Sequence, residues 1–182
     1  VLTELVFAGK SSTHTFMCAA LAASADPTGE LALAVDLMNR VVDGIEGPLR
    51  AVHVCRGNWS RDEAVLLKGS YDDLMPHLAR MRLDQYVLEY ATPRAGDQAL
   101  LAKLPKTAHI GFGVVNPRTS ELEDPAAIAA RVRALAETLG HERIHLNPDC
   151  GFGTFAERPM NSSECAADKV RMLAEAARLL RG

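Results

Sequence analysis

Hydrophobic positions recur every three or four residues over residues 30–47 and then give way to a continuous apolar run over residues 49–55. The first pattern predicts an amphipathic helix that ends near Gly44 and Gly47, and the second predicts a short strand. The helical stripe consists of four aliphatic side chains: Leu33, Leu37, Val41 and Ile45. This helix and strand begin a series in which the two kinds of element alternate.

Three more apolar runs predict strands, over residues 83–90, 108–115 and 143–147. Segments with helical spacing separate them. Strands that alternate with helices through short connections predict a parallel sheet, with functional groups at the C-terminal ends of its strands. The chain supports about four such units, whereas a complete TIM-type barrel has eight. The pattern therefore leaves half a barrel and an open α/β sheet as alternatives.

Helices are predicted between and after these strands. Residues 71–81 form one in spite of Pro76, which starts or kinks it, and residues 94–104 form another. The next helix is predicted from a stripe of four side chains, Ile128, Val132, Leu135 and Leu139. The last helix is expected to begin at Asn161, because Glu164 three residues later completes a capping box. Its apolar stripe consists of Ala166, Val170, Leu173, Ala177 and Leu180.

The chain has 182 residues, which is enough for one sizeable core and too few for two ordinary domains. Its net charge of -3 provides no basic surface for nucleic acid or for a membrane. No apolar run approaches the roughly 18 residues that span a bilayer. Residues 16–27 faintly resemble a secretory signal, but Glu4 and many polar residues precede them, so we expect a cytoplasmic protein.

Four potential metal ligands stand at the predicted C-terminal ends of three strands. His53 and Cys55 are two residues apart, so their side chains leave the same face of one strand. Glu89 ends the second strand, and Cys150 follows the fourth in a turn rich in proline and glycine. Two thiolates, an imidazole and a carboxylate favour zinc over magnesium or calcium. Taken singly, each also has an ordinary interpretation, such as strand packing or an ion pair between Glu89 and Arg94.

The chain resembles the C-terminal half of the cobalamin-independent methionine synthase family in four segments that follow the family's order: "HVCRGNW", "LEYATPRAGD", "GFGVVNPRT" and "LNPDCGFGTF". The resemblance is to the short, single-barrel branch and covers residues 30–182. It implies an α/β fold of parallel βα units from a TIM-type (β/α)8 barrel, with only the C-terminal half present in a single partial domain over residues 1–182. Residues 1–29 match nothing in the family and are expected to be poorly ordered. The family's zinc ligands fall on four residues: His53, Cys55, Glu89 and Cys150.

The resemblance implies transfer of a methyl group from 5-methyltetrahydrofolate to the thiol of homocysteine, which gives methionine. Zinc would keep the thiol deprotonated, and the leaving folate amine needs a general acid. Long family members have a histidine after the third strand, where this chain has Asn116 and Arg118. Arg118 cannot donate a proton near neutral pH, so the proton donor is unassigned. Weak substrate contacts are expected from Asn58, Asn116, Arg118 and Arg158.

Two other functions are compatible with the same residues. A zinc-activated thiol could accept another alkyl group, for example from an epoxide onto a coenzyme M-like thiol, because thiolate activation does not fix the electrophile. Alternatively, the chain is an inactive, truncated half-barrel that keeps its zinc site. In that case a homodimer could complete the barrel.

Overall fold

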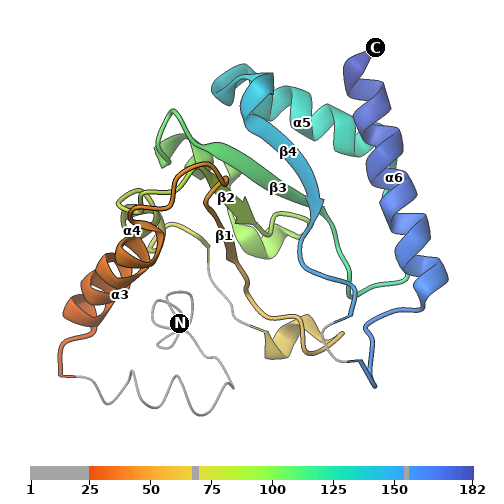
Figure 1. The fold of residues 1–182 in the computed structure, drawn as a ribbon. Coiled ribbons are helices and arrows are strands. Elements are labelled where there is room, and N and C mark those ends of the chain that lie inside the picture. Colours follow the sequence, from red (N-terminus) through yellow and green to blue (C-terminus); the bar gives the residue numbers. More distant parts are fainter. Residues whose placement is uncertain (1–24, 67–69, 154–155) are drawn as a thin grey trace.

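The computed structural model describes residues 25–66, 70–153 and 156–182, so the expectations for residues 1–24 lie outside the described residues. The centre of the protein is one parallel sheet with the strand order β1-β2-β3-β4 (Figure 1). Its strands are β1 (Ala51–Val54), β2 (Gln85–Leu88), β3 (His109–Val115) and β4 (Ile144–Pro148). All four predicted strands are present. Because every neighbouring pair is parallel, their C-terminal ends lie at the same edge of the sheet.

The helices of the described ranges are α3 (Pro27–Val42), α4 (Met75–Leu78), α5 (Pro125–Leu139) and α6 (Ser163–Arg181). Short 3-10 helices separate them: η1 (Glu63–Val65), η2 (Pro93–Ala95), η3 (Gln98–Lys103) and η4 (His141–Arg143). Pro76 lies in the first turn of α4, where its missing N–H is not needed, so it starts the helix rather than kinking it. The α-helix predicted over residues 94–104 is wrong. Gly96, at φ +85°, and Pro105 confine this segment to two short 3-10 helices.

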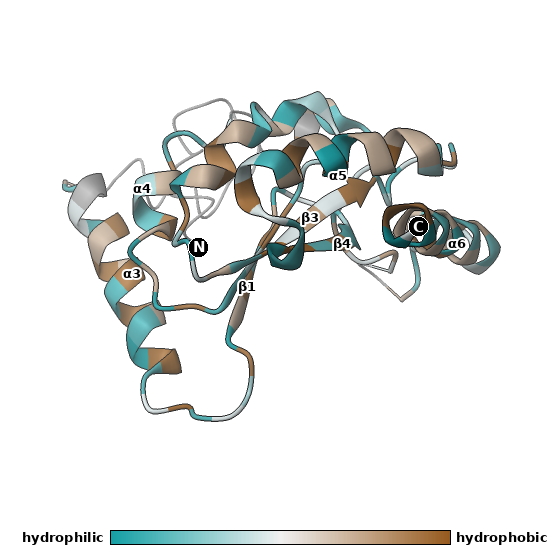
Figure 2. Cartoon of the chain, turned by 90° about the horizontal axis from the view of Figure 1, so that it is seen from above, coloured by the Kyte–Doolittle hydropathy of each residue, from teal (hydrophilic) through white to brown (hydrophobic). Residues whose placement is uncertain are grey.

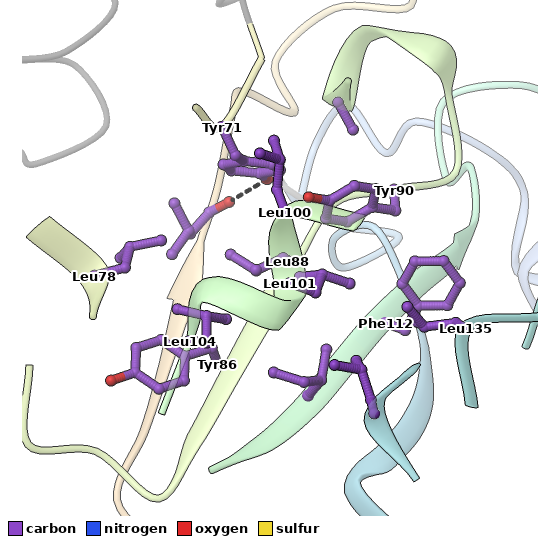
Figure 3. Close-up of a cluster of buried hydrophobic side chains, with 14 of the residues drawn as sticks. Tyr71, Leu78, Tyr86, Leu88, Tyr90, Leu100, Leu101, Leu104, Phe112 and Leu135 are labelled. Atoms are coloured by element: carbon purple, nitrogen blue, oxygen red, sulfur yellow. Dashed lines mark hydrogen bonds between the residues drawn. The ribbon is translucent and has the colours of Figure 1, made fainter. Parts of the chain in front are cut away.

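The hydrophobic core lies against the sheet on the side of α4 and α5. Viewed from above, α4 and α5 lie along one side of the sheet, α3 lies beyond the β1 edge and α6 beyond the β4 edge (Figure 2). Figure 3 shows the central cluster, in which Phe112 of β3 and Leu135 of α5 are both buried. The ring centroid of Phe112 is 5.5 Å from that of Tyr90, just beyond β2. The core therefore reaches the strand ends at which the predicted ligands stand.

Helix α3 buries a different face from the one that its hydrophobic spacing indicates. The four residues of the predicted stripe are 43–68% exposed: Leu33, Leu37, Val41 and Ile45. Instead, α3 contacts the core through the fully buried Val35, with Met38 and Val42 packed beside it. The spacing thus predicted the helix correctly but not the side that it buries.

The start of α6 also differs from the sequence expectation. The side chain of Ser162, not of Asn161, caps the helix by accepting a hydrogen bond from the N–H of Cys165. Asn161 instead donates to two backbone carbonyls of the segment after β3. In the predicted stripe, Leu173 packs on the core while Val170 is 51% exposed. Among the described residues, no helix combines the length and hydrophobicity that a membrane span requires.

Candidate metal centre

The ends of β1, β2 and β4 bring the four predicted ligands to one place. His53 lies within β1, Cys55 and Glu89 directly follow β1 and β2, and Cys150 lies two residues after β4. Their four donor atoms all lie within 4.8 Å of one another. The last paired residues of β1 and β2 face each other, so the residues that follow them leave the sheet side by side. The parallel register therefore assembles this cluster.

The four side chains differ in their access to solvent. The sulfurs of Cys55 and Cys150 are 3.9 Å apart, and both cysteines are half-buried. Glu89 Oε1 is 4.0 Å from His53 Nε2. The Glu89 side chain is 1% exposed, whereas that of His53 is 36% exposed. The carboxylate thus forms the floor of the cluster, and the imidazole lies at its solvent side.

The carboxylate of Glu89 has one oxygen engaged and one without a hydrogen bond. Arg94 Nη2 donates to Oε2 over 3.4 Å, so the ion pair named above as an ordinary interpretation of Glu89 is present. Oε1 is buried and has no hydrogen-bond partner in the described part of the chain. Burial, together with the charges of Asp149 and Cys55, raises the pKa of Glu89 to about 8. A buried acceptor without a donor needs an explanation, and a cation among the four donors would provide one.

The two thiols hold protons unequally in the metal-free chain. Their mutual hydrogen bond lowers the pKa of Cys150 to about 7 and raises the pKa of Cys55 to about 12, a rise to which burial also contributes. Hydrogen bonding to Cys55 raises the pKa of His53 as well. Cys150 is therefore the more acidic thiol of the pair. A metal ion would have to displace protons from the site in order to bind.

Asp149, which precedes Cys150, fastens the ligand loop to its neighbours. Its backbone N–H donates to the last residue of β3 over 2.8 Å, and its Oδ1 accepts from the N–H of Ala91 over 2.8 Å. Its Oδ2 accepts from Arg118 over 3.3 Å, and both side chains are fully buried. Arg118 also donates to Glu63, in the segment after β1. This role of Asp149 was not predicted from the sequence. In the sequence, its position next to Cys150 is what could have indicated it.

The predicted substrate-binding residues lie around the cluster but are largely engaged with the protein itself. Asn58 is buried and donates to the carbonyl of Gly151, which follows Cys150, over 2.7 Å. Asn116 donates to Glu63 over 3.3 Å, and Arg118 is buried as described above. Arg158 is exposed in the segment before α6. Three of the four therefore support the loops that surround the candidate ligands.

The chain is similar in sequence to known proteins. Residues 64–178, more than half of the chain, match the family described as cobalamin-independent synthase, catalytic domain. A methionine synthase of Thermococcus kodakarensis is 32% identical over 123 residues, which are 68% of this chain and 32% of that protein. A 2-hydroxypropyl-CoM lyase of Xanthobacter autotrophicus is 25% identical over 174 residues, and the match covers 81% of this chain and 45% of that protein. The chain thus spans about a third of the length of the first of these relatives.

A solved structure has a similar fold. The B12-independent methionine synthase from Shewanella sp. W3-18-1 superposes with a TM-score of 0.66 at 18% identity, over 81% of this chain and 42% of that chain. The four parallel strands therefore form part of a TIM-type barrel, and the alternative of an open α/β sheet is wrong. By its sequence match and its fold together, this chain belongs to the cobalamin-independent methionine synthase family, within the catalytic domain.

Proposed function

We propose that the protein acts in zinc-dependent methyl transfer from 5-methyltetrahydrofolate to the thiol of homocysteine, which gives methionine. One observation carries the proposal: two thiols, an imidazole and a carboxylate converge at the strand ends of a domain of this family. Methionine synthases are among the relatives of the chain. The chain spans about a third of the length of such a relative, so the reaction and its substrates are our proposal for this chain.

The residues present fit a zinc ion. Zinc binds thiolate sulfur at about 2.3 Å, so two sulfurs of a tetrahedral site lie about 3.8 Å apart. The sulfurs of Cys55 and Cys150 are 3.9 Å apart before any adjustment. His53 Nε2 and Glu89 Oε1, at 4.0 Å, would have to approach by less than about 1 Å. The unpartnered Oε1 of Glu89 leaves an oxygen free to bind a cation, and the two soft sulfurs favour zinc over a hard cation.

The chain's own residues would hold the four ligands ready for the reaction. When bound, zinc supplies Lewis acidity that keeps a substrate thiol deprotonated. Arg94 fixes one carboxylate oxygen of Glu89 and leaves the other directed to the cluster. Asp149 and Asn58 hold the Cys150 turn from two sides. Since His53 lies at the solvent side, a thiol from solution would approach past the imidazole.

Arg118 has a supporting role in this proposal rather than a role in proton transfer. The leaving folate nitrogen needs a proton, and a guanidinium does not give one up near neutral pH. Arg118 is fully buried and paired with Glu63 and Asp149. We therefore assign it to the support of the Cys150 turn.

A second candidate function is another zinc-activated alkyl transfer, for instance of an epoxide onto a coenzyme M-like thiol. The observation that favours it is the similarity to a 2-hydroxypropyl-CoM lyase over 81% of this chain. The same four ligands would serve, because the thiolate is the nucleophile in both reactions. A third possibility is an inactive half-barrel that binds zinc and completes its barrel as a homodimer.

Zinc content tests the ligand assignment. Wild type is expected to hold about one zinc per chain, and Cys150→Ser markedly less. Cys165→Ser is the matched control: Cys165 is also a half-buried free thiol, but it lies on α6, outside the ligand cluster. Equal zinc content in wild type and Cys150→Ser would refute the assignment. Removal of zinc with a chelator should also lower the melting temperature of wild type.

Turnover separates the three functions. Methionine formation from homocysteine and 5-methyltetrahydrofolate supports the first, and consumption of epoxypropane with coenzyme M supports the second. A zinc-loaded protein that is inactive in both assays supports the third, and light scattering then shows whether it is a dimer. Zinc-loaded protein with no methyl transfer would overturn the methyltransferase proposal and leave the metal site standing.

A further inference from the structure

Tyr71 lies between the two strand ends that carry three of the four candidate ligands. Its hydroxyl donates to the carbonyl of Val54 over 3.2 Å and accepts from the N–H of Glu89 over 3.0 Å. Val54 is the residue between His53 and Cys55. A single hydroxyl therefore connects the backbone of the β1 ligands to the backbone of the β2 ligand.

This bridge stands where the pairing of the sheet ends. The last paired residues of β1 and β2 are Val54 and Leu88, and Glu89 follows directly. Beyond this point, the described residues of the two segments form no further β1–β2 pair, so strand pairing no longer fixes their separation. The Tyr71 hydroxyl supplies that connection by satisfying one acceptor on β1 and one donor after β2.

Tyr71 is itself held rigidly. It is fully buried near Tyr90 (Figure 3), and the two ring centroids are 5.4 Å apart. The guanidinium of Arg56 lies over the Tyr71 ring, 5.1 Å from its centroid. Its backbone N–H donates to the carbonyl of Ala95 over 3.3 Å. Ala95 follows Arg94, which holds the Glu89 carboxylate. Tyr71 therefore contacts both the backbone of Glu89 and the loop that fixes its side chain.

The close approach of this loop depends on a glycine. Gly96 has φ +85°, and a Cβ at this position would lie 2.6 Å from Cβ of Ser70, the residue before Tyr71. A larger residue would therefore push the segment with Tyr71 away from the loop.

We propose that Tyr71 is a positioning residue of the metal centre, whose hydroxyl sets the separation between His53 and Cys55 on one side and Glu89 on the other. This inference rests on the proposed metal site. Residues behind the ligands tune metal affinity because ligand distances tolerate only small errors, and their loss typically lowers affinity about 10–100-fold. Loss of the hydroxyl alone should therefore weaken metal binding although the aromatic ring remains.

The test compares two tyrosine-to-phenylalanine variants of the full chain. Tyr71→Phe removes the bridging hydroxyl. Tyr86→Phe is the matched control, because Tyr86 is also fully buried and its hydroxyl also donates to a backbone carbonyl, that of Met81, over 2.8 Å. Tyr86 lies in β2, and its hydroxyl bonds to Met81, before the strand, rather than to a strand end that carries a ligand. Zinc affinity is measured by competition with a chromophoric chelator, and stability of the metal-free proteins by urea unfolding.

Tyr71→Phe is expected to lower zinc affinity about 10–100-fold, and Tyr86→Phe to change it less than about twofold. Without metal, Tyr71→Phe should lose more stability than Tyr86→Phe, because it removes two hydrogen bonds rather than one, so zinc affinity and the spectrum below, not stability, decide the positioning role. The ligand-field spectrum of the cobalt-substituted protein should change only for Tyr71→Phe. Equal zinc affinity in wild type and Tyr71→Phe would overturn the positioning role. A wild type that binds no zinc would overturn the metal site itself and the positioning role with it.

Discussion

Replacement of Asp149 by alanine is expected to destabilise the protein strongly, because it removes the acceptor of two donors at once. The buried Arg118 would lose its partner at 3.3 Å, and the N–H of Ala91 would lose its acceptor at 2.8 Å. Removing one partner of a buried ion pair costs about 3–5 kcal/mol. Glu63 still balances part of the Arg118 charge, so we expect the lower end of this range, about 3 kcal/mol.

A double-mutant cycle isolates the ion pair from other losses at the same site. Arg118→Met removes the second charge, so the double variant should be more stable than additivity predicts, by about 1–3 kcal/mol. Urea unfolding followed by circular dichroism gives the four free energies. The exposed pair between Lys103 and Asp72, at 3.5 Å, is the control and should couple by about 0–1 kcal/mol. A coupling between Asp149 and Arg118 no larger than this control would refute the reasoning.

Two further predictions follow from the site. Zinc affinity should rise with pH, because Glu89, with a pKa of about 8, and Cys55, with a pKa of about 12, are protonated at pH 7 and must lose these protons to bind. Competition titrations should show at least two protons released near pH 7, because Cys150, with a pKa of about 7, is partly protonated as well, and an affinity independent of pH would contradict this. Gly113→Ala should cost about 1–3 kcal/mol in thermal or urea unfolding, because its Cβ would lie 2.5 Å from Asp149 Oδ1. Gly151→Ala, whose Cβ meets nothing within 4 Å, should be neutral, and equal losses in both variants would speak against this steric account.

The candidate ligands could be predicted from the sequence because their positions depend on local rules. Apolar runs located the four strands, and alternation with helices predicted that the strands are parallel. Parallel strands place their C-terminal ends at one edge, so His53, Cys55, Glu89 and Cys150 could be grouped without any knowledge of distances. The structure brings these four donors within 4.8 Å of one another. Residue type and strand position were sufficient for this result.

The helices show where local rules stop. The stripe of α3 gave the correct helix but the wrong buried face, because the spacing of apolar residues does not tell which neighbour lies beside them. At α6, the sequence pattern indicated Asn161 as the cap, whereas it is Ser162 that accepts the helix N–H. The side chain of Asn161 instead donates hydrogen bonds to backbone carbonyls of a segment more than 40 residues away in the chain.

The sequence by itself determined the strands, their parallel arrangement and the set of candidate metal ligands. The tertiary structure decided what holds these ligands: Tyr71 bridges β1 and β2, and Asp149 joins the Cys150 turn to Arg118 and Ala91. It also paired His109 with His145, at 3.1 Å, although their spacing of 36 residues gave no sign of contact. The physical reason is that periodicity reports which side of an element is apolar. A hydrogen bond between distant residues depends instead on the register and packing of the whole sheet.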